Sequence, residues 1–235
     1  MKIQIEFNPV DHSYIIDGHT DTISVTQLVK QVYPFDERRI AYAYAKKHGR
    51  SVEDVLASWA HTAERGSRIH EVAEAYILGK PDPEGRPEEK PYYDQIKKAI
   101  DRLRKTVEDE GLTFKASPEM IVGTTFSLVA GTIDLLVDLG NKYYMLIDYK
   151  SSENMPQSKL NKYSLQLALY KEILLKHYLP EGSKVESFVC WVTPEKATWF
   201  SDKPKPNDSR HLMDQTVAAK TLLNQRYLRL KQMAA

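Results

Sequence analysis

Cysteine is almost absent from this sequence, and its scarcity excludes several kinds of site. The 235 residues contain one cysteine, Cys190. The chain can therefore form no intramolecular disulfide and no four-cysteine zinc or iron–sulfur centre. Cys190 lies in the apolar run 188–191, which predicts a buried core thiol.

Long apolar runs and an excess of charge of one sign are also missing. No stretch has the roughly 20 apolar residues of a membrane span, and no signal-peptide pattern is present. We therefore expect no membrane association and a cytoplasmic location. The formal net charge is +1, so any nucleic-acid site must be a local basic patch rather than a field of the whole molecule.

The residues that are present alternate between strand and helix patterns. Periodicity and capping residues predict helices over 25–32, 36–47, 51–78, 92–110, 160–178 and 208–232, with Ser24 or Thr26 and then Ser51 as N-caps. Strands are predicted over 2–7, 13–16, 121–122, 127–138, 143–149, 185–192 and 197–200.

This order predicts an α/β fold in which helices flank a central mixed β-sheet, with a helical N-terminal region. The length fits a single domain over 1–235. We expect a hairpin and helices over 1–110, the core sheet over 111–202, and a closing segment over 203–235 that begins with the proline-containing linker 203–206.

Two carboxylates and a lysine fall on adjoining strands. Gly140–Asn141 supplies the positive-φ residues of a tight hairpin turn between these strands. Asp134 lies inside the first strand. Asp148 and Lys150 project from one face of the next, because side chains along a strand alternate with a period of two. Burying these charges requires compensation, which a hard divalent cation provides. This hairpin therefore predicts a metal site whose lysine orients or deprotonates a water.

A second candidate group lies on one stripe of the helix predicted over 51–78. Gly66, His70 and Glu74 follow one another at intervals of four residues. A glycine here lets a backbone or a phosphate approach closely. His70 suits Mg²⁺ or Mn²⁺ beside carboxylates, although a lone histidine on a half-buried face is more often a satisfied core residue.

Two further candidates stand on either side of the hairpin. Gln166 and Tyr170 lie one turn apart on one face of a predicted helix, a pattern that by itself fits a core or surface position. Glu119, which follows Pro118 in the strand before the hairpin, is either an exposed acidic residue or a member of the site.

In chain order these motifs resemble those of the PD-(D/E)XK nuclease superfamily and of its RecB-type exonuclease branch. The resemblance covers three motifs between residues 66 and 170: G-x-x-x-H-x-x-x-E, then Gly131-Thr132-Ile133-Asp134 with Asp148-Tyr149-Lys150, then Q-x-x-x-Y. Ile133 stands where the family pattern usually has proline. The segment Ser24-Val25-Thr26 is similar to one that lies near the nucleic-acid path in phage and mitochondrial genome-maintenance exonucleases.

The resemblance implies a DNA-binding, metal-dependent nuclease with one or two Mg²⁺ or Mn²⁺ ions and no iron–sulfur cluster. It implies that the metal ligands are His70, Asp134, Asp148, the carbonyl of Tyr149 and Glu119, and that Lys150, Asp134 and Asp148 are catalytic. It implies that the residues that contact DNA or order the site are Gly66, Glu74, Ser151, Gln166 and Tyr170. Recombination or repair proteins are candidate partners, and the oligomeric state is left open.

Aromatic residues interleave with cations in the N-terminal helices. The aromatics are Tyr33, Phe35, Tyr42, Tyr44 and Trp59, and the cations are Arg38, Arg39, Lys46, Lys47 and Arg50. This composition is typical of a single-strand channel, because bases stack on rings while cations follow phosphates. The alternative is that Tyr42 and Trp59 are core residues and that the lysines form a solvated face.

The sequence as a whole predicts a DNA exonuclease that acts on ends or single strands. Three alternatives stay open. They are a structure-specific or restriction-type endonuclease on the same fold, a non-catalytic DNA-binding subunit, and a metal-binding domain unrelated to nucleic acid. The intact set of Asp134, Asp148 and Lys150 argues against the non-catalytic subunit.

Overall fold

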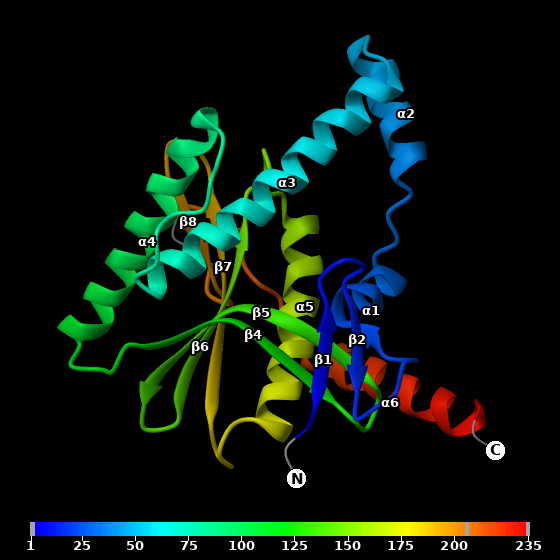
Figure 1. The fold of residues 1–235 in the computed structure, drawn as a ribbon, viewed down its shortest axis with the longest axis vertical. Coiled ribbons are helices and arrows are strands. Elements are labelled where there is room, and N and C mark those ends of the chain that lie inside the picture. Colours follow the sequence, from blue (N-terminus) through cyan, green and yellow to red (C-terminus); the bar gives the residue numbers. More distant parts are fainter. Residues whose placement is uncertain (1–2, 205–206, 234–235) are drawn as a thin grey trace.

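The chain folds as a mixed β-sheet with helices on both faces (Figure 1). The computed structural model describes residues 3–204 and 207–233. Its strands are β1 (Ile5–Asn8), β2 (Ser13–Ile16), β3 (Ile23–Ser24), β4 (Lys115–Thr124), β5 (Val129–Gly140), β6 (Tyr143–Lys150), β7 (Lys184–Val192) and β8 (Ala197–Phe200). Its helices are α1 (Val25–Val32), α2 (Glu37–His48), α3 (Val52–Ile77), the short 3-10 helix η1 (Pro87–Glu89), α4 (Lys90–Asp109), α5 (Gln157–His177) and α6 (Thr216–Met233).

Strand β5 organises the sheet, because three strands pair with it. β4 runs antiparallel along residues 129–138 on one edge. On the other edge β3 runs parallel at residues 129–130, and β6 runs antiparallel at residues 135–140. In the register of these described strands, residues 131–134 pair with neither β3 nor β6. The sheet therefore opens along this edge beside Asp134.

The rest of the sheet follows from the connections. β6 and β7 run parallel, so the chain must cross over between them, and α5 is the crossover helix. β8 turns back antiparallel onto β7 as the outer strand. At the β5–β6 turn, Gly140 and Asn141 both have positive φ, as expected, and so does Lys142.

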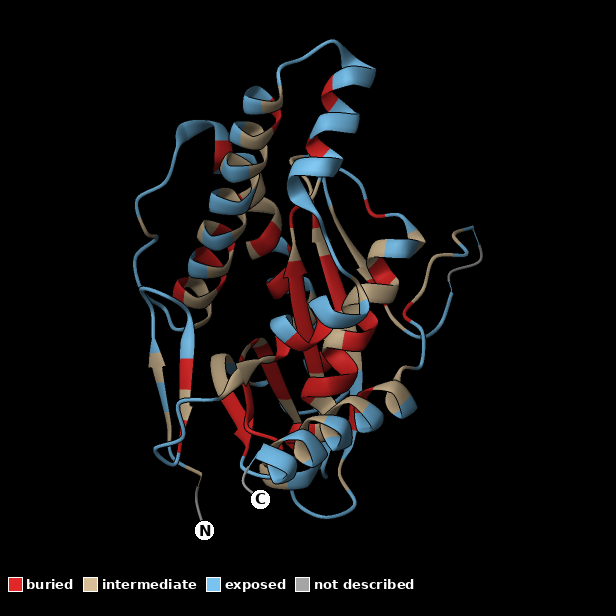
Figure 2. Cartoon of the chain, turned by 90° about the vertical axis from the view of Figure 1, so that its right-hand side faces the viewer, coloured by how far each residue is buried: buried red, intermediate tan, exposed pale blue. Residues whose placement is uncertain are grey.

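Each face of the sheet has its own hydrophobic core. Helices α1, α5 and α6 cover one face, where Leu136 and Leu146 are buried. Helices α3 and α4 cover the other, where Val137, Ile147 and Cys190 are buried. Figure 2 shows the buried residues concentrated in the strands and on the helix faces that touch them. The central mixed sheet flanked by helices confirms the predicted fold class.

Helix α2 and the first turns of α3 project from the body of the molecule (Figure 1). A small separate core of Ala41, Ala45 and Val55 holds the two helices together. In the described part of the chain, no helix has the length and apolar character needed to cross a membrane.

The structure differs from the predicted helices and strands at several points. β4 has ten residues rather than the two expected, and β3 was not expected at all. The closing helix begins at Thr216 instead of residue 208, because the preceding segment is held by side-chain contacts, including that of the Arg210 guanidinium with the carbonyl of Met155. Ser24, not Thr26, is the N-cap of α1. Lys2 of the first expected strand, and Lys205 and Pro206 of the expected linker, lie outside the described residues.

Candidate metal centre and active site

Three predicted ligands converge from α3, β4 and β5. The Nδ1 atom of His70 lies 3.5 Å from Oδ1 of Asp134 and 3.7 Å from Oε1 of Glu119. One ligand atom from each residue lies within 4.8 Å of the other two. The sequence left Glu119 between an exposed position and a site role, and the fold places it in this cluster.

The strand pairing explains how Glu119 reaches the site. Pro118 pairs with Leu135 and Met120 with Ile133, so Glu119 stands opposite Asp134 in the register. The backbone of Glu119 has a φ of 46°, in the left-handed region that few non-glycine residues occupy. Strained backbone of this kind clusters at functional sites, because only the surrounding structure maintains it.

The backbone of Tyr149 orients two of the three ligands. Its N–H donates to Oδ2 of Asp134 at 2.7 Å, which leaves Oδ1 facing His70. Its carbonyl oxygen lies 3.2 Å from Nε2 of His70. With the proton on Nε2 the ring donates to this carbonyl, and Nδ1 presents a lone pair to the two carboxylates. The Tyr149 carbonyl, predicted as a metal ligand, thus contacts the histidine.

Asp148 and Lys150 form a second group beside the first. Nζ of Lys150 lies 2.6 Å from Oδ2 of Asp148, and Gln166 donates from Nε2 to Oδ1 at 3.0 Å. Oδ2 is buried, and this ion pair with Lys150 is its only polar contact among the described residues. Asp148 and Lys150 share one face, as the two-residue period predicted, but Asp148 is turned toward Lys150 and Gln166 rather than into the His70 cluster.

Burial and charge pull the pKa values of these groups in opposite directions. Burial by itself would lower the pKa of His70, but Asp134 and Glu119 outweigh it and raise the pKa to about 9. Burial raises the pKa of Asp148 to about 6, against the lowering effect of Lys150. For Lys150, burial is outweighed by Asp148 and Asp134, which raise its pKa. The site is therefore strongly attractive to positive charge.

The donor set fits a divalent cation. Two ligands that each lie about 2.1 Å from one ion are at most about 4.2 Å apart, and the distances of 3.5 and 3.7 Å from Nδ1 of His70 satisfy this limit. Two carboxylates and one imidazole form a mixed oxygen and nitrogen donor set that a divalent metal ion can bind. The raised pKa of His70 has the same cause, because a proton on the ring provides the positive charge that the carboxylates favour.

The cluster lies in a cavity of about 950 Å³ between α3, the sheet, α5 and the β1–β2 hairpin. Seven other predicted site residues line this cavity: Gly66, Glu74, Tyr149, Lys150, Ser151, Gln166 and Tyr170. Glu74 is outside the group of three ligands. A Cβ added to Gly66 would lie 3.6 Å from Oγ of Ser151, an ordinary contact, so packing within the chain does not require a glycine there.

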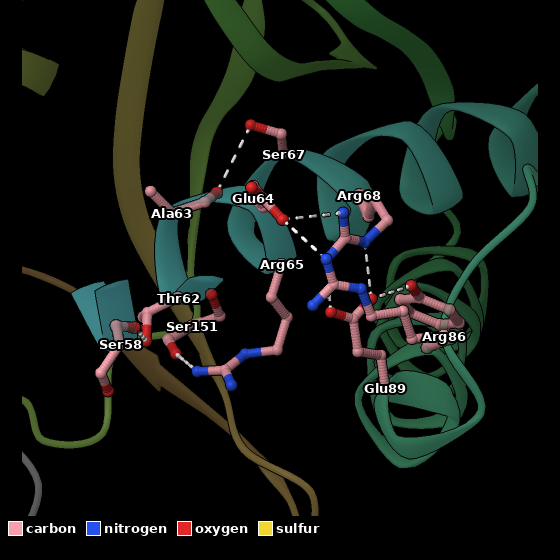
Figure 3. Close-up of polar contacts among 11 residues, drawn as sticks. Ser58, Thr62, Ala63, Glu64, Arg65, Ser67, Arg68, Arg86, Glu89 and Ser151 are labelled. Carbon is pink, nitrogen blue, oxygen red and sulfur yellow. Dashed lines mark hydrogen bonds and ion pairs between the residues drawn. The ribbon is translucent and has the colours of Figure 1, made fainter. Parts of the chain in front are cut away.

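Several residues at the site were not singled out from the sequence. The ring of Tyr163 lies 5.0 Å from Nζ of Lys150. The sequence contains a signal for it, because Tyr163 precedes Gln166 by three residues and therefore lies on the face of α5 that carries Gln166 and Tyr170. Arg65 donates from Nη2 to the carbonyl of Ser151 at 3.2 Å (Figure 3). No sequence pattern indicated that contact, which joins residues 86 positions apart.

A polar network anchors α3 next to His70. Arg68 donates from Nε and Nη2 to the two oxygens of Glu89 at 2.6 and 2.5 Å, and the Tyr93 hydroxyl donates to the same carboxylate. Figure 3 shows Arg86 and Glu64 beside this pair. Hydrogen bonds from Arg68 lower the pKa of Glu89 to about 2. The network holds α3 against η1 and α4, and so sets the height of His70 above the sheet.

Comparisons with known proteins point to one family. A family model described as the PD-(D/E)XK nuclease superfamily matches residues 39–234. No curated protein matches the sequence. The crystal structure of SSO0001 superposes with a TM-score of 0.38 and 16% sequence identity, over 89% of this chain and 76% of that one. Likeness at that level carries no argument, so the family assignment rests on the family model.

Proposed function

This chain belongs to the PD-(D/E)XK nuclease superfamily, and we propose that it is a Mg²⁺- or Mn²⁺-dependent DNA exonuclease of the RecB-type branch. The observation that carries the proposal is the convergence of His70, Glu119 and Asp134 beside the Asp148–Lys150 pair. Members of this superfamily are nucleases that use divalent metals. The exonuclease assignment, DNA as the substrate and the choice of metal are our proposals.

The proposed mechanism assigns a separate task to each group. His70, Glu119 and Asp134 would hold the ion, and Asp148 and the Tyr149 carbonyl belong to the proposed ligand set. A divalent ion, when bound, polarises the scissile phosphate and lowers the pKa of a bound water. Lys150, whose raised pKa keeps it protonated, positions the attacking water and stabilises the developing negative charge rather than accepting a proton.

The remaining site residues orient these groups. Gln166 holds Asp148 through Oδ1. Tyr170, Gly66, Glu74 and Ser151 line the cavity through which DNA would reach the metal. We propose that the whole chain acts as a single nuclease domain in the cytoplasm, with recombination or repair proteins as candidate partners.

A cleavage time course tests the proposal. End-labelled linear single strands, linear duplex and a closed circle would each be incubated with Mg²⁺, Mn²⁺ or EDTA. We expect metal-dependent loss of the linear substrates while the circle stays intact, and the position of the label gives the polarity. A nicked or linearised circle would instead indicate the endonuclease.

The Lys150→Ala variant provides the matched control. We expect it to lose cleavage while its DNA affinity stays close to that of the wild type, because the lysine contributes to the chemical step. Cleavage at the wild-type rate would show that the site is wrongly assigned. DNA binding by the wild type with no cleavage under any metal would indicate the non-catalytic subunit, and metal binding without DNA binding would indicate a domain unrelated to nucleic acid.

A further inference from the structure

Three aromatic rings of the β1–β2 hairpin line the same cavity as the metal centre. Phe7, His12 and Tyr14 border this cavity together with His70 and Asp134. The ring centroids of Phe7 and Tyr14 are 4.9 Å apart, and those of Phe7 and His12 are 5.9 Å apart. The three rings thus form a continuous surface, here called the aromatic wall.

The aromatic wall is anchored close to the metal ligands. Tyr14 is buried, and its hydroxyl lies 3.0 Å from Oγ1 of Thr132, two residues before Asp134. The hairpin also fits closely against β4, since a Cβ at Gly123 would lie 2.9 Å from Cδ1 of Ile5. Packing therefore holds the hairpin that carries the wall beside β4 and β5 (Figure 1).

Two rings of the wall keep free surface. Phe7 is half-buried, His12 is exposed, and both line the cavity, whereas Tyr14 serves as the anchor. On the α3 side, Ala63, Gly66 and Ser67 also line the cavity. These small residues leave room for a flat group between α3 and the wall.

We propose that Phe7 and His12 form a binding subsite for an unpaired nucleobase of the strand whose phosphate is held at the metal centre. This inference rests on the proposed function, and it deepens it by naming single-stranded DNA, or a frayed end, as the preferred substrate. A metal centre attracts a phosphate, and aromatic faces in the same cavity stack with the attached base. A base inside a duplex is already stacked between its neighbours, so it cannot stack on Phe7 or His12 unless its pair opens.

The experiment separates recognition from cleavage. In a Lys150→Ala background, fluorescence anisotropy would measure the affinity for a labelled single strand and for a blunt duplex of the same sequence, with Phe7→Leu and His12→Ala added singly. A single strand carrying 2-aminopurine at one end or the other reports stacking through quenching of its fluorescence. Phe7→Tyr keeps the ring, and Val10→Ala alters the hairpin tip, where Val10 is 90% exposed.

We expect Phe7→Leu to weaken single-strand binding roughly tenfold and to relieve the quenching, because base–aromatic stacking is worth about that much per base. His12→Ala should act in the same direction. Phe7→Tyr, Val10→Ala and duplex binding should be unaffected. His12→Ala changes an exposed residue, so it remains a fair test if Phe7→Leu folds poorly.

Two outcomes would overturn the subsite. One is an equal loss of affinity for single strand and duplex, and the other is unchanged quenching in both variants. A protein with intact Lys150 that still digests linear DNA under those results would keep the proposed function while losing the subsite. Normal stacking without any cleavage by the wild type would keep the subsite and contradict the proposed function.

Discussion

At the scale of single residues, the two aspartates of the site each have different partners at their two oxygens. Oδ2 of Asp134 accepts a hydrogen bond from the Tyr149 N–H, and Oδ1 faces His70. Oδ1 of Asp148 accepts a hydrogen bond from Gln166, and Oδ2 forms the ion pair with Lys150. Because each oxygen has its own neighbour, the carboxylates are oriented before any ligand arrives, which reduces the cost of binding.

Gln166 is the residue whose orienting role is simplest to test. Gln166→Ala removes the hydrogen bond to Oδ1 of Asp148, so we expect activity or metal affinity to fall roughly 10- to 100-fold, the usual effect of losing such a partner. Single-turnover cleavage and calorimetric Mg²⁺ titration would measure it. Lys171→Ala on the same helix is the control, and a similar loss there would point to a general effect on α5.

Replacing each of two glycines at the site by alanine should affect the free energy of unfolding differently. A Cβ at Gly131 would lie 2.6 Å from the hydroxyl of Tyr170, whose side chain is buried and would have to shift. We expect Gly131→Ala to lower the free energy of unfolding by about 1–3 kcal/mol. Gly66→Ala, inside α3 with room for a Cβ, should leave it unchanged or raise it by up to about 1 kcal/mol.

Urea denaturation at neutral pH would compare the two variants. Equal destabilisation would contradict the difference in packing. If Gly66→Ala is as stable as expected but loses DNA cleavage, a phosphate approaches α3 at that position, as the sequence suggested.

At the scale of elements, α3 has the largest effect on the site, because it carries His70. Polar contacts join it to the neighbouring segments on both of its sides. The Arg68–Glu89 pair joins it to η1, and Arg65 joins it to the end of β6. Glu89 is 1% exposed, so removing its charge takes away the short ion pair of the mostly buried Arg68 and leaves the longer one to Glu64 at 3.8 Å.

The Glu89 pair also predicts a pH dependence of stability. The pKa of the Glu89 carboxyl falls from 4.5 to about 2 on folding. The stabilisation is therefore fully present above about pH 4.5 and is lost as the pH falls toward 2. Glu89→Gln should lower the free energy of unfolding by about 3 kcal/mol at pH 7. Urea denaturation of variant and wild type should show this difference shrinking between pH 4.5 and pH 2, and a constant difference would contradict the assignment.

At the scale of the whole molecule, the α2–α3 hairpin projects from the body, and most residues of α2 are exposed. Tyr42 is 63% exposed, so it is not the core residue that the sequence left as an alternative. Trp59 is partly buried and packs beside the rings of Phe35 and Tyr44. The cations of α2 point to solvent, and with a net charge of only +1 they form a local patch.

This patch predicts a salt-dependent contact with DNA. Replacing Lys46 and Lys47 by alanine should weaken DNA binding irrespective of sequence and reduce the slope of log affinity against log salt by about two, one for each cation. Anisotropy titrations across a salt series would measure the slope. Lys105→Ala, at an exposed cation on α4, is the control, and an unchanged slope in the double variant would exclude the patch from the DNA path.

Local pattern in the sequence was enough to locate the β5–β6 hairpin, the shared face of Asp148 and Lys150, most helices and the mixed sheet. A period of two or 3.6 residues and the turn residues act over short distances, so they can be recognised without the fold. The existence of β3 and the length of β4 escaped detection because both depend on pairing with β5.

The composition of the candidate site came from packing. His70 and Asp134 lie 64 positions apart, and only the fit of α3 on the sheet sets their distance. The same packing brings Glu119 into the cluster and turns Asp148 toward Gln166 and Lys150. The aromatic wall also depends on packing, because the rings of the hairpin line the cavity only where β1 and β2 lie beside the sheet. Long-range contacts of this kind leave no periodic trace in the chain, because the free energy that forms them is shared among many apolar residues.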